Sequence, residues 1–363
     1  MAKPSRRRRG VTTIEDVARA AGVSAMTVSR VINHGKNVRE STRASVVEAI
    51  KQLNYSPNTA ARSLAAGHAT HIGLLYANPS AGYLAQFLIG ALHAARSAGV
   101  HLVIEACESE EAEEQAGITR RFATSDVEGV VLPPPLSESQ AILAELDVMG
   151  MPAVTVAMGT PRPDSLNVRI DDYAAAKEMT RYLLDLGHRR IGFIKGHPRH
   201  IASHDRYRGF CDALSDEGID PTSAPAEQGY FSYRSGLIAG ERLLGRPDRP
   251  TAIFASNDDM AAATISIAHR MELDVPQDVS VVGFDDTALA TSVWPELTTV
   301  KQPIAEMAEA ALELLIDDLR RRRAGTARKF TERVLSHAMV IRESSGPPAP
   351  PGEARKARSP ARG

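Results

Sequence analysis

Cysteine is scarce in this chain. Its two cysteines, Cys107 and Cys211, stand far apart in the sequence and match no metal-binding or redox spacing. This excludes a disulfide-rich scaffold and a cysteine-based metal site. We expect two buried, reduced thiols.

Long hydrophobic runs are also lacking. No stretch approaches the roughly 18 consecutive apolar residues of a membrane-spanning helix. The N-terminal residues MAKPSRRRRG are basic, but no apolar run follows them, so the segment lacks the pattern of a secretory signal peptide. We therefore expect a cytoplasmic protein in which residues 1–10 form a basic, disordered arm.

Motifs of catalysis are missing as well. The sequence has no recognisable nucleophile–base set, no metal-binding motif and no glycine-rich phosphate loop. His197, His200 and His204 stand near Asp205, but Pro198 interrupts the helix that would align them. The sequence therefore predicts neither an enzyme nor a bound metal or cofactor.

Charge is unevenly distributed along the chain. The 363 residues have a formal net charge of −1, with 43% hydrophobic and 24% charged residues. This composition is ordinary for a globular protein, and the length favours more than one domain. Residues 1–66 contain twelve Lys and Arg but four Asp and Glu, a formal charge of +8. A basic N-terminal segment before an acidic remainder indicates a phosphate-bearing partner for that segment alone.

Residues 12–33, TTIEDVARAAGVSAMTVSRVIN, have the pattern of two short helices joined by a tight turn. Thr13 and Asp16 are spaced as a capping box for the first helix, Gly22 suits the turn, and Ser24 suits the cap of the second helix. The inner faces are predicted to be made by Val17, Ala20, Ala21, Val28, Val31 and Ile32. A helix–turn–helix places its second helix in the major groove of DNA.

The alternative for this segment is an ordinary helical hairpin inside a core. A small, open face argues against it, made by Ala25, Met26, Ser29 and Arg30. We therefore predict a helix–turn–helix DNA-binding domain over residues 11–55. Its third helix is expected at residues 40–54, where apolar side chains recur at helical spacing at Val46, Val47, Ile50 and Leu53.

Residues 56–68 are predicted to form a short hinge helix. Ser56 suits the cap, Pro57 the first helical position and Gly67 the end. Isolated helices shorter than about 12–15 residues are marginal in water, so this segment is expected to fold conditionally. The alternative is a plain linker.

From residue 71 onward, short apolar runs alternate with helical patterns, which is typical of parallel strands covered on both faces. Strands are expected at residues 71–77, 101–106, 129–132, 153–157, 190–195, 252–255 and 279–284. Helices are expected at residues 83–98, 111–124, 137–149, 173–186, 204–217, 233–244, 259–271 and 304–323. The number and even spread of the strands favour two α/β subdomains, with ligands bound outside the carboxyl ends of the strands. Residues 345–363, rich in Pro, Arg and Ala, are expected to form a disordered tail.

Seven segments occur in the order found in the lactose/galactose repressor family of bacterial transcriptional regulators, which this chain resembles over about residues 11–343. They are TIEDVARAAGVSAMTVSRVIN, LNYSPNTAARSLA, LGHRRIGFI, RYRGF, FASNDDMA, DVSVVGFDD and LTTVKQP. The resemblance implies a helix–turn–helix head that reads operator DNA. It also implies a body like a periplasmic binding protein, with two doubly wound parallel-sheet subdomains.

This family's chains cross three times between the subdomains. Carried over, the N-subdomain spans about residues 70–170 and 301–331, and the C-subdomain about 171–300 and 332–344, within a domain at 70–343. The resemblance implies a repressor that assembles as a dimer or tetramer. No leucine-heptad tail follows Glu343, so we expect a homodimer.

The resemblance also implies the DNA contacts. Some positions match hydroxyls and polar groups that hold phosphates and fix register. Ala25, Met26 and Arg30 match base-reading positions, where arginine bridges guanine and the apolar side chains offer only apolar contact. Leu64 matches a leucine that wedges into the minor groove. The implied set is Ser24, Ala25, Met26, Thr27, Ser29, Arg30, Asn33, His34, Asn58, Ala61 and Leu64. The alternative for Met26 and Leu64 is packing on the head's own core.

A small-molecule effector, expected to be a sugar or glycoside, is implied between the subdomains. Arg206 matches an effector-binding arginine and Phe231 an aromatic position that stacks on the effector. An aspartate such as Asp285 accepts hydroxyl hydrogen bonds and an arginine donates a fork of them, which suits a polyol. The implied set is Asn78, Ser80, Tyr83, His200, Arg206, Phe231, Asn257, Asp258, Asp285 and Gln302.

Three alternatives stay open. Asp258 fits equally well as the N-cap of the helix that follows it. A purine base is the second candidate for the effector, because Arg206 and Phe231 also suit a planar ring. A solute-binding protein would share the body, although the basic head and the missing signal peptide argue against that class.

Overall fold

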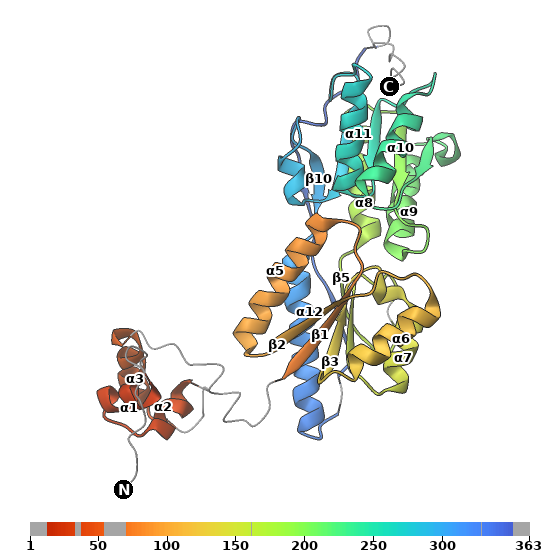
Figure 1. Cartoon of the computed structure of the whole chain (residues 1–363). Coiled ribbons are helices and arrows are strands. Elements are labelled where there is room, and N and C mark those ends of the chain that lie inside the picture. The colour runs from red at the N-terminus through yellow and green to blue at the C-terminus, as the bar shows by residue number, and fades with distance from the viewer. Residues whose placement is uncertain (1–12, 33–37, 54–69, 161, 328, 351–363) are drawn as a thin grey trace. The chain divides into compact units, whose positions relative to one another are not determined.

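The computed structural model describes residues 13–32, 38–53, 70–160, 162–327 and 329–350, which belong to two compact units, residues 1–69 and 70–363 (Figure 1). The first unit contains α1 (Ile14–Ala21), α2 (Ala25–Ile32) and α3 (Glu40–Gln52). No helix among the described residues is both long and apolar enough to cross a membrane.

Local hydrogen bonds explain where the first two helices begin and end. The Thr13 hydroxyl accepts from the Asp16 N–H at 3.3 Å, and the Asp16 carboxylate accepts from the Thr13 N–H at 3.0 Å, which confirms the capping box. Gly22 ends α1 at φ +65°, a left-handed conformation that favours glycine. The Ser24 hydroxyl then accepts from the Thr27 N–H at 3.1 Å and caps α2.

The core of this unit is small and differs in part from the predicted one. Its buried side chains are Val17, Ala18, Val28, Val31, Val46 and Ala49. Ala20 is exposed and Ala18 is buried in its place, and Val47 is 41% exposed. The prediction was wrong at Ala20, because α1 packs on the other helices through Val17 and Ala18. The side chain of Ile32 lies outside the described part of the chain.

The second unit contains two six-stranded sheets, each the centre of a lobe (Figure 1). Lobe 1 has the strand order β11-β5-β4-β3-β1-β2 and lobe 2 the order β12-β10-β9-β8-β6-β7. All neighbours are parallel except β12, which is antiparallel to β10. The strands of lobe 1 are β1 (His71–Tyr76), β2 (His101–Ala106), β3 (Gly129–Leu132), β4 (Ala153–Val156), β5 (Leu166–Arg169) and β11 (Thr331–Val334). Those of lobe 2 are β6 (Ile191–Lys195), β7 (Ala226–Gln228), β8 (Ala252–Ala255), β9 (Ser280–Asp285), β10 (Thr298–Lys301) and β12 (Ala338–Val340).

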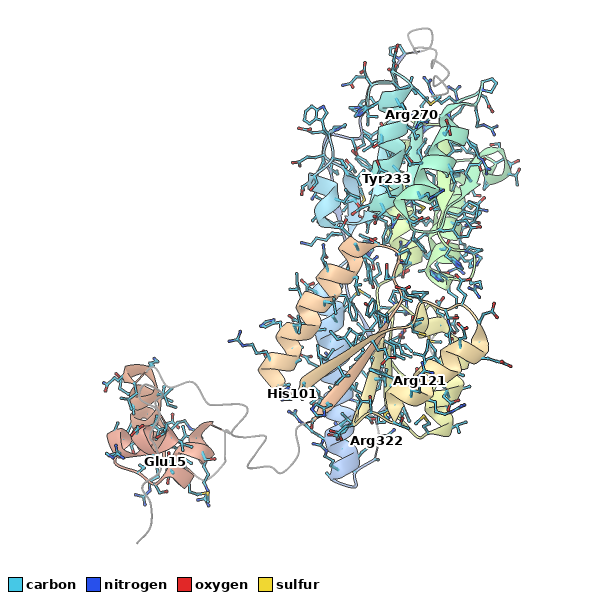
Figure 2. The ribbon with its side chains drawn as sticks, viewed as in Figure 1. Glu15, His101, Arg121, Tyr233, Arg270 and Arg322 are labelled. Atoms are coloured by element: carbon cyan, nitrogen blue, oxygen red, sulfur yellow. The ribbon has the colours of Figure 1, made fainter. Side chains whose placement is uncertain are left out.

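Helices cover both faces of each sheet, as expected for a doubly wound fold. In lobe 1, α5 (Ala81–Ala98) packs on α12 (Ile304–Arg323), and α6 (Ala112–Ala123) packs on α7 (Gln140–Val148) across the sheet (Figure 1). In lobe 2, α8 (Asp172–Asp185) packs on α9 (Ile201–Asp216), and α10 (Tyr233–Leu244) packs on α11 (Asp258–Arg270). The side chains of successive strand residues point to opposite faces of the sheet. Phe193 and Ile194 therefore pack in two separate cores, one under each helix pair. Arg121 and Arg322 lie at the end of lobe 1 remote from lobe 2 (Figure 2).

The chain crosses between the lobes three times, after β5, after β10 and after β11. The return to the C-subdomain, expected at about residue 332, follows β11, because β11 pairs with β5 in lobe 1, with Thr331 opposite Leu166. The expected helix at 137–149 is a 3₁₀ turn at Leu136–Glu138 followed by α7. The expected tail also starts too early, since the His188 Nε2 lies 2.9 Å from the Gly346 carbonyl oxygen and the Tyr182 and Ser345 hydroxyls lie 2.8 Å apart.

Candidate functional site

A cavity lies where the carboxyl ends of the strands of both lobes meet. Nine of the ten residues predicted to contact the effector line it, and Asp258 does not. The lining residues are Asn78, Pro79, Ser80, Tyr83, Pro134, Pro135, Glu138, Ala157, His200, Ala202, Arg206, Phe231, Asn257, Asp285 and Gln302.

Arg206, on α9, is the centre of a hydrogen-bonded network in lobe 2 and is only 5% exposed. Its Nε donates to Asp172 Oδ1 at 2.8 Å and its Nη1 donates to the Ser256 carbonyl oxygen at 2.5 Å. The guanidinium also lies 3.6 Å from the centroid of the Phe284 ring. Burial raises the pKa of Asp172, and the adjacent Arg206 opposes that shift. The guanidinium is therefore held in one orientation.

Asp285 ends β9 and is 4% exposed. It has a positive φ of 119°, which is rare for a residue with a side chain and places strain at this site. Its Oδ1 accepts from Gln302 Nε2 at 2.6 Å and lies 4.0 Å from Arg206 Nη1. Burial raises the pKa of Asp285 well above its ordinary value, and Arg206 again opposes the shift.

Asp258 lies in the core of lobe 2. Its carboxylate accepts from the Thr299 hydroxyl at 2.6 Å and from the Thr287 N–H at 2.7 Å. The N-cap of α11 is Asn257, whose side chain accepts from the Met260 N–H at 3.0 Å. Both interpretations of Asp258 from the sequence were therefore wrong: its side chain ties α11 to β10 and to the loop after β9.

Lobe 1 supplies Tyr83, Asn78 and Ser80. Tyr83 is 5% exposed, and its hydroxyl has no hydrogen-bond partner among the described residues. Asn78 donates to the Pro134 carbonyl oxygen at 3.2 Å. Ser80 caps α5 and donates to Asp259 Oδ2 of lobe 2 at 2.6 Å. Of these three residues, Tyr83 thus presents an unsatisfied donor and Ser80 makes a bond across the cavity.

His200 and Phe231 contribute rings to the cavity. The two rings are nearly parallel, with centroids 5.7 Å apart, and Phe231 has a positive φ of 58°. Burial lowers the pKa of His200 to about 3, so its imidazole is neutral at ordinary pH. His200 also stacks on His197, while His204 Nε2 lies 2.6 Å from the Pro198 carbonyl oxygen.

Sequence reasoning missed Glu138 and the prolines of the loop after β3. The run PPPLSE follows the strand directly, so its position at a carboxyl end was a usable signal. Because the rest of this run is uncharged, sequence reasoning overlooked its single charged residue, Glu138, which lines the cavity. Glu138 accepts from the N–H groups of Ile201 and Gly159, at 3.0 Å and 3.4 Å.

The exposed face of α2 carries the candidate DNA contacts that the structure describes. Met26 is 64% exposed and Arg30 is exposed, so packing on the core is excluded for Met26. Ala25 packs partly on the core. The Ser24 and Thr27 hydroxyls lie 2.9 Å apart, and Ser29 is partly exposed. The candidates outside the described residues are Asn33, His34, Asn58, Ala61 and Leu64.

A helix–turn–helix unit joined in one chain to a two-lobed α/β body with a polar cavity is the architecture of a ligand-responsive DNA-binding regulator. The family model for bacterial regulatory proteins of the lacI family matches residues 13–58, and that for the periplasmic binding protein-like domain matches residues 180–345. The chain is 36% identical over 317 residues to the HTH-type transcriptional repressor PurR of Edwardsiella ictaluri (strain 93-146), covering 86% of this chain and 92% of the relative. The chain belongs to the lacI family and is a DNA-binding transcriptional repressor of that family.

Solved structures agree with this assignment. A complex of the transcriptional regulator CelR with cellobiose has a TM-score of 0.69 at 31% identity, over 92% of this chain and 100% of that chain. The lac repressor dimer bound to operator and the anti-inducer ONPF has a TM-score of 0.68 at 27% identity, over 93% and 100%. The predicted family and fold class are thereby confirmed, and these relatives are regulators rather than enzymes.

Proposed function

We propose that the cavity between the lobes binds a hydroxyl-rich ring, a sugar or glycoside, and that this ligand controls the protein's affinity for operator DNA. The observation that carries the proposal is the convergence of a buried guanidinium, Arg206, a buried carboxyl group, Asp285, and the unsatisfied hydroxyl of Tyr83 on one cavity. A ring with several hydroxyl groups both donates and accepts, so it satisfies all three. The likeness to a regulator solved with cellobiose supports the same class.

A purine base is the second candidate. The aromatic ring of Phe231 and the neighbouring Arg206 guanidinium, 5.8 Å from its centroid, suit a planar heterocycle. The PurR relatives also point in this direction. The two candidates differ in the number of hydroxyl groups they bring to Asp285.

Closure of the lobes is the proposed route from ligand to DNA. The Ser80 hydroxyl donates to Asp259, and Gln86 Nε2 donates to the Asp286 carbonyl oxygen at 3.0 Å; these bonds are among those that tie lobe 1 to lobe 2. A ligand shifts DNA affinity only if it binds one arrangement of the lobes better than another. The expected coupling is about 1–3 kcal/mol, and operator DNA must change ligand affinity by the same factor.

Calorimetry tests the effector class directly. A panel of monosaccharides and disaccharides, with adenine, guanine and hypoxanthine, is titrated into the full-length protein with and without operator. Binding of one sugar with an affinity that changes on adding operator supports the proposal. Binding of a base alone moves the assignment to the second candidate. A ligand that binds equally well in both conditions is not the effector.

For operator DNA we propose that α2 reads base edges through Arg30 and Met26. Arg30→Ala is expected to cost about 1–3 kcal/mol of operator affinity and to relax one base position. Footprinting on a set of single-base operator variants measures both. A uniform loss on all sequences, random DNA included, would reassign Arg30 to phosphate contact.

We further propose a homodimer on a pseudo-palindromic operator. Exposed apolar side chains on neighbouring parts of lobe 1 support a partner surface there: Ile89 and Leu92 of α5, and Ile104 of the edge strand β2. Sedimentation of the wild type and of Leu92→Glu tests it. A wild type that sediments as a monomer at the concentrations used for DNA binding contradicts the proposal.

A further inference from the structure

Glu138 comes from lobe 1 but meets the first turn of a helix in lobe 2. Its carboxylate accepts from the N–H of Ile201, the first residue of α9. The N-cap residue of α9, His200, makes no side-chain cap of its own. Gly159 allows the close approach, because a Cβ there would lie 2.1 Å from Ile201 Cγ2. Glu138 therefore supplies the missing cap from the opposite lobe.

This position is the one where a ligand anion would otherwise bind. The start of a helix combines unpaired N–H groups with a partial positive charge, and phosphates and carboxylates bind there readily. The start of α9 borders the cavity, since His200 and Ala202 line it. In the arrangement of the lobes seen here, the protein's own Glu138 carboxylate occupies the position.

The remaining charges of the cavity reinforce the effect. Among the described residues, two carboxylates line it, Asp285 and Glu138, against one lining cation, Arg206. That guanidinium is already bonded to Asp172. His200 adds no positive charge, because burial keeps its imidazole neutral. Burial raises the pKa of both carboxyl groups, and at Glu138 the N–H groups of Ile201 and Gly159 oppose that shift. An anionic ligand would therefore find the start of α9 already occupied and only a single, engaged guanidinium for compensation.

We propose that Glu138 determines ligand charge in this cavity: it occupies the anion position of α9 and restricts the site to uncharged or positively charged ligands that donate hydrogen bonds. The inference deepens the proposed function and rests on the same cavity. The buried, unsatisfied Tyr83 hydroxyl is an independent sign that a polar ligand completes this site. Sugar phosphates, sugar acids and nucleotides are excluded, whereas sugars, amino sugars and free bases are admitted.

The test is a gain of function in the full-length protein. Sulfate is titrated by calorimetry at constant ionic strength, with chloride as the balancing ion. The wild type is expected to show no saturable binding. Glu138→Ala is expected to bind sulfate at least about tenfold more tightly than the wild type, equivalent to about 1.4 kcal/mol. Equal sulfate affinity in the two proteins would overturn the proposal.

Two further variants keep the result interpretable. Glu138→Gln removes the charge but keeps an oxygen that accepts from the Ile201 N–H, so it can replace Glu138→Ala if that variant does not fold. It should bind sulfate more tightly than the wild type, but with a smaller increase than Glu138→Ala. No increase in sulfate affinity would overturn the proposal. Glu114→Ala, on the exposed surface of α6, removes the same charge away from the cavity and should leave sulfate binding unchanged. An equal gain in Glu114→Ala would mean that net charge, rather than Glu138, sets the discrimination.

A second arm compares glucose with glucose 6-phosphate, and adenine with adenosine monophosphate. The wild type should bind no phosphorylated member more tightly than its neutral partner, and the reverse order contradicts the proposal. If no sugar binds, the proposed sugar effector fails, but the sulfate titration still decides the role of Glu138. The two failures are thus distinguishable.

Discussion

The two halves of the cavity are built in different ways. In lobe 2, Arg206 bonds Asp172 and Asp285 accepts from Gln302, so the polar groups are held by partners on their own side. In lobe 1, Ser80 and Glu138 bond to lobe 2, and the Tyr83 hydroxyl has no partner among the described residues.

This difference indicates which lobe binds the ligand first. Bonds within one lobe survive when the lobes separate, whereas bonds across the cavity break. Lobe 2 should therefore hold the ligand in either arrangement, and lobe 1 should add its contacts only on closure.

The largest expected effect is that of Arg206→Ala. It leaves Asp172 buried without its partner, which should lower the free energy of unfolding by about 3–5 kcal/mol. It should also abolish measurable effector binding. Chemical denaturation and calorimetry measure the two effects. Arg208→Ala, whose side chain on the same helix is 62% exposed, is the matched control and should change neither. If Arg206→Ala bound the ligand with wild-type affinity, lobe 2 would not be the lobe that holds the ligand in both arrangements.

Asp258 should make the stability of lobe 2 depend on pH. Burial raises its pKa from 3.8 to about 7, although the hydroxyls and N–H that it accepts from oppose the shift. Between these values the folded protein keeps a proton that the unfolded chain has lost. The free energy of unfolding should therefore fall as pH rises from about 4 to 7, by about 1.4 kcal/mol for each pH unit.

Asp258→Asn tests this pH dependence. The amide oxygen still accepts from the Thr287 N–H, and the amide nitrogen can donate to the Thr299 hydroxyl, so the variant should fold. Urea denaturation between pH 4 and pH 8 should give a flatter profile than that of the wild type. An unchanged profile would mean that Asp258 is ionised throughout this range.

Ser80→Ala should weaken closure. It removes the cap of α5 and the bond to Asp259, with an expected loss of about 1–2 kcal/mol of stability and a weaker coupling between effector and operator. Asp171→Ala removes a cap on α8 and is the control. Both variants should lose stability, but only Ser80→Ala should lose coupling. Equal coupling in the two would show that the bond between the lobes plays no part in closure.

The smallest effect on stability is expected for Tyr83→Phe. The hydroxyl that it removes is buried without a partner among the described residues, so the free energy of unfolding should stay the same or rise by up to about 1 kcal/mol. Effector affinity should fall about tenfold, because a bonding partner of the ligand is lost. Tyr182→Phe, which loses a hydroxyl bonded to Ser345, should behave in the opposite way. A Tyr83→Phe variant with unchanged affinity would mean that the hydroxyl does not meet the ligand.

Much of the fold could be predicted because strands buried in a parallel sheet consist of short runs of apolar residues. The strands at 101–106, 129–132 and 252–255 were predicted to the residue, as were the helices at 233–244 and 304–323. The sequence did not indicate β5, β7, β10, β11 or β12. These are three or four residues long, and segments such as TERV and AEQ are too polar to resemble buried strands. Their pairing with neighbouring strands, rather than their own composition, makes them strands.

The site could be predicted only as far as position after a strand determines it. Asn257 and Asp285 were placed correctly near the cavity for that reason. Asp258 was not, because successive residues of a helix point in directions about 100° apart, and its side chain turns toward Thr287 and Thr299. The position of Glu138 shortly after β3 was a usable signal for the cavity, but its bond to Ile201 depends on α9, which lies in the other lobe, so no local pattern could reveal that bond.

The late strand β11 has a consequence for how the chain acquires its structure. It pairs with β5, made from a segment near the middle of the sequence, and β12 then pairs with β10 in the other sheet. Neither lobe is therefore encoded by a continuous stretch of the gene. During synthesis the sheet of lobe 1 has its last strand only after residue 334 has been made, and the sheet of lobe 2 only after residue 340. Contacts of such long sequence separation form slowly. A fragment that ends before residue 331 encodes neither lobe in full, and it leaves edges of β5 and β10 open to other chains.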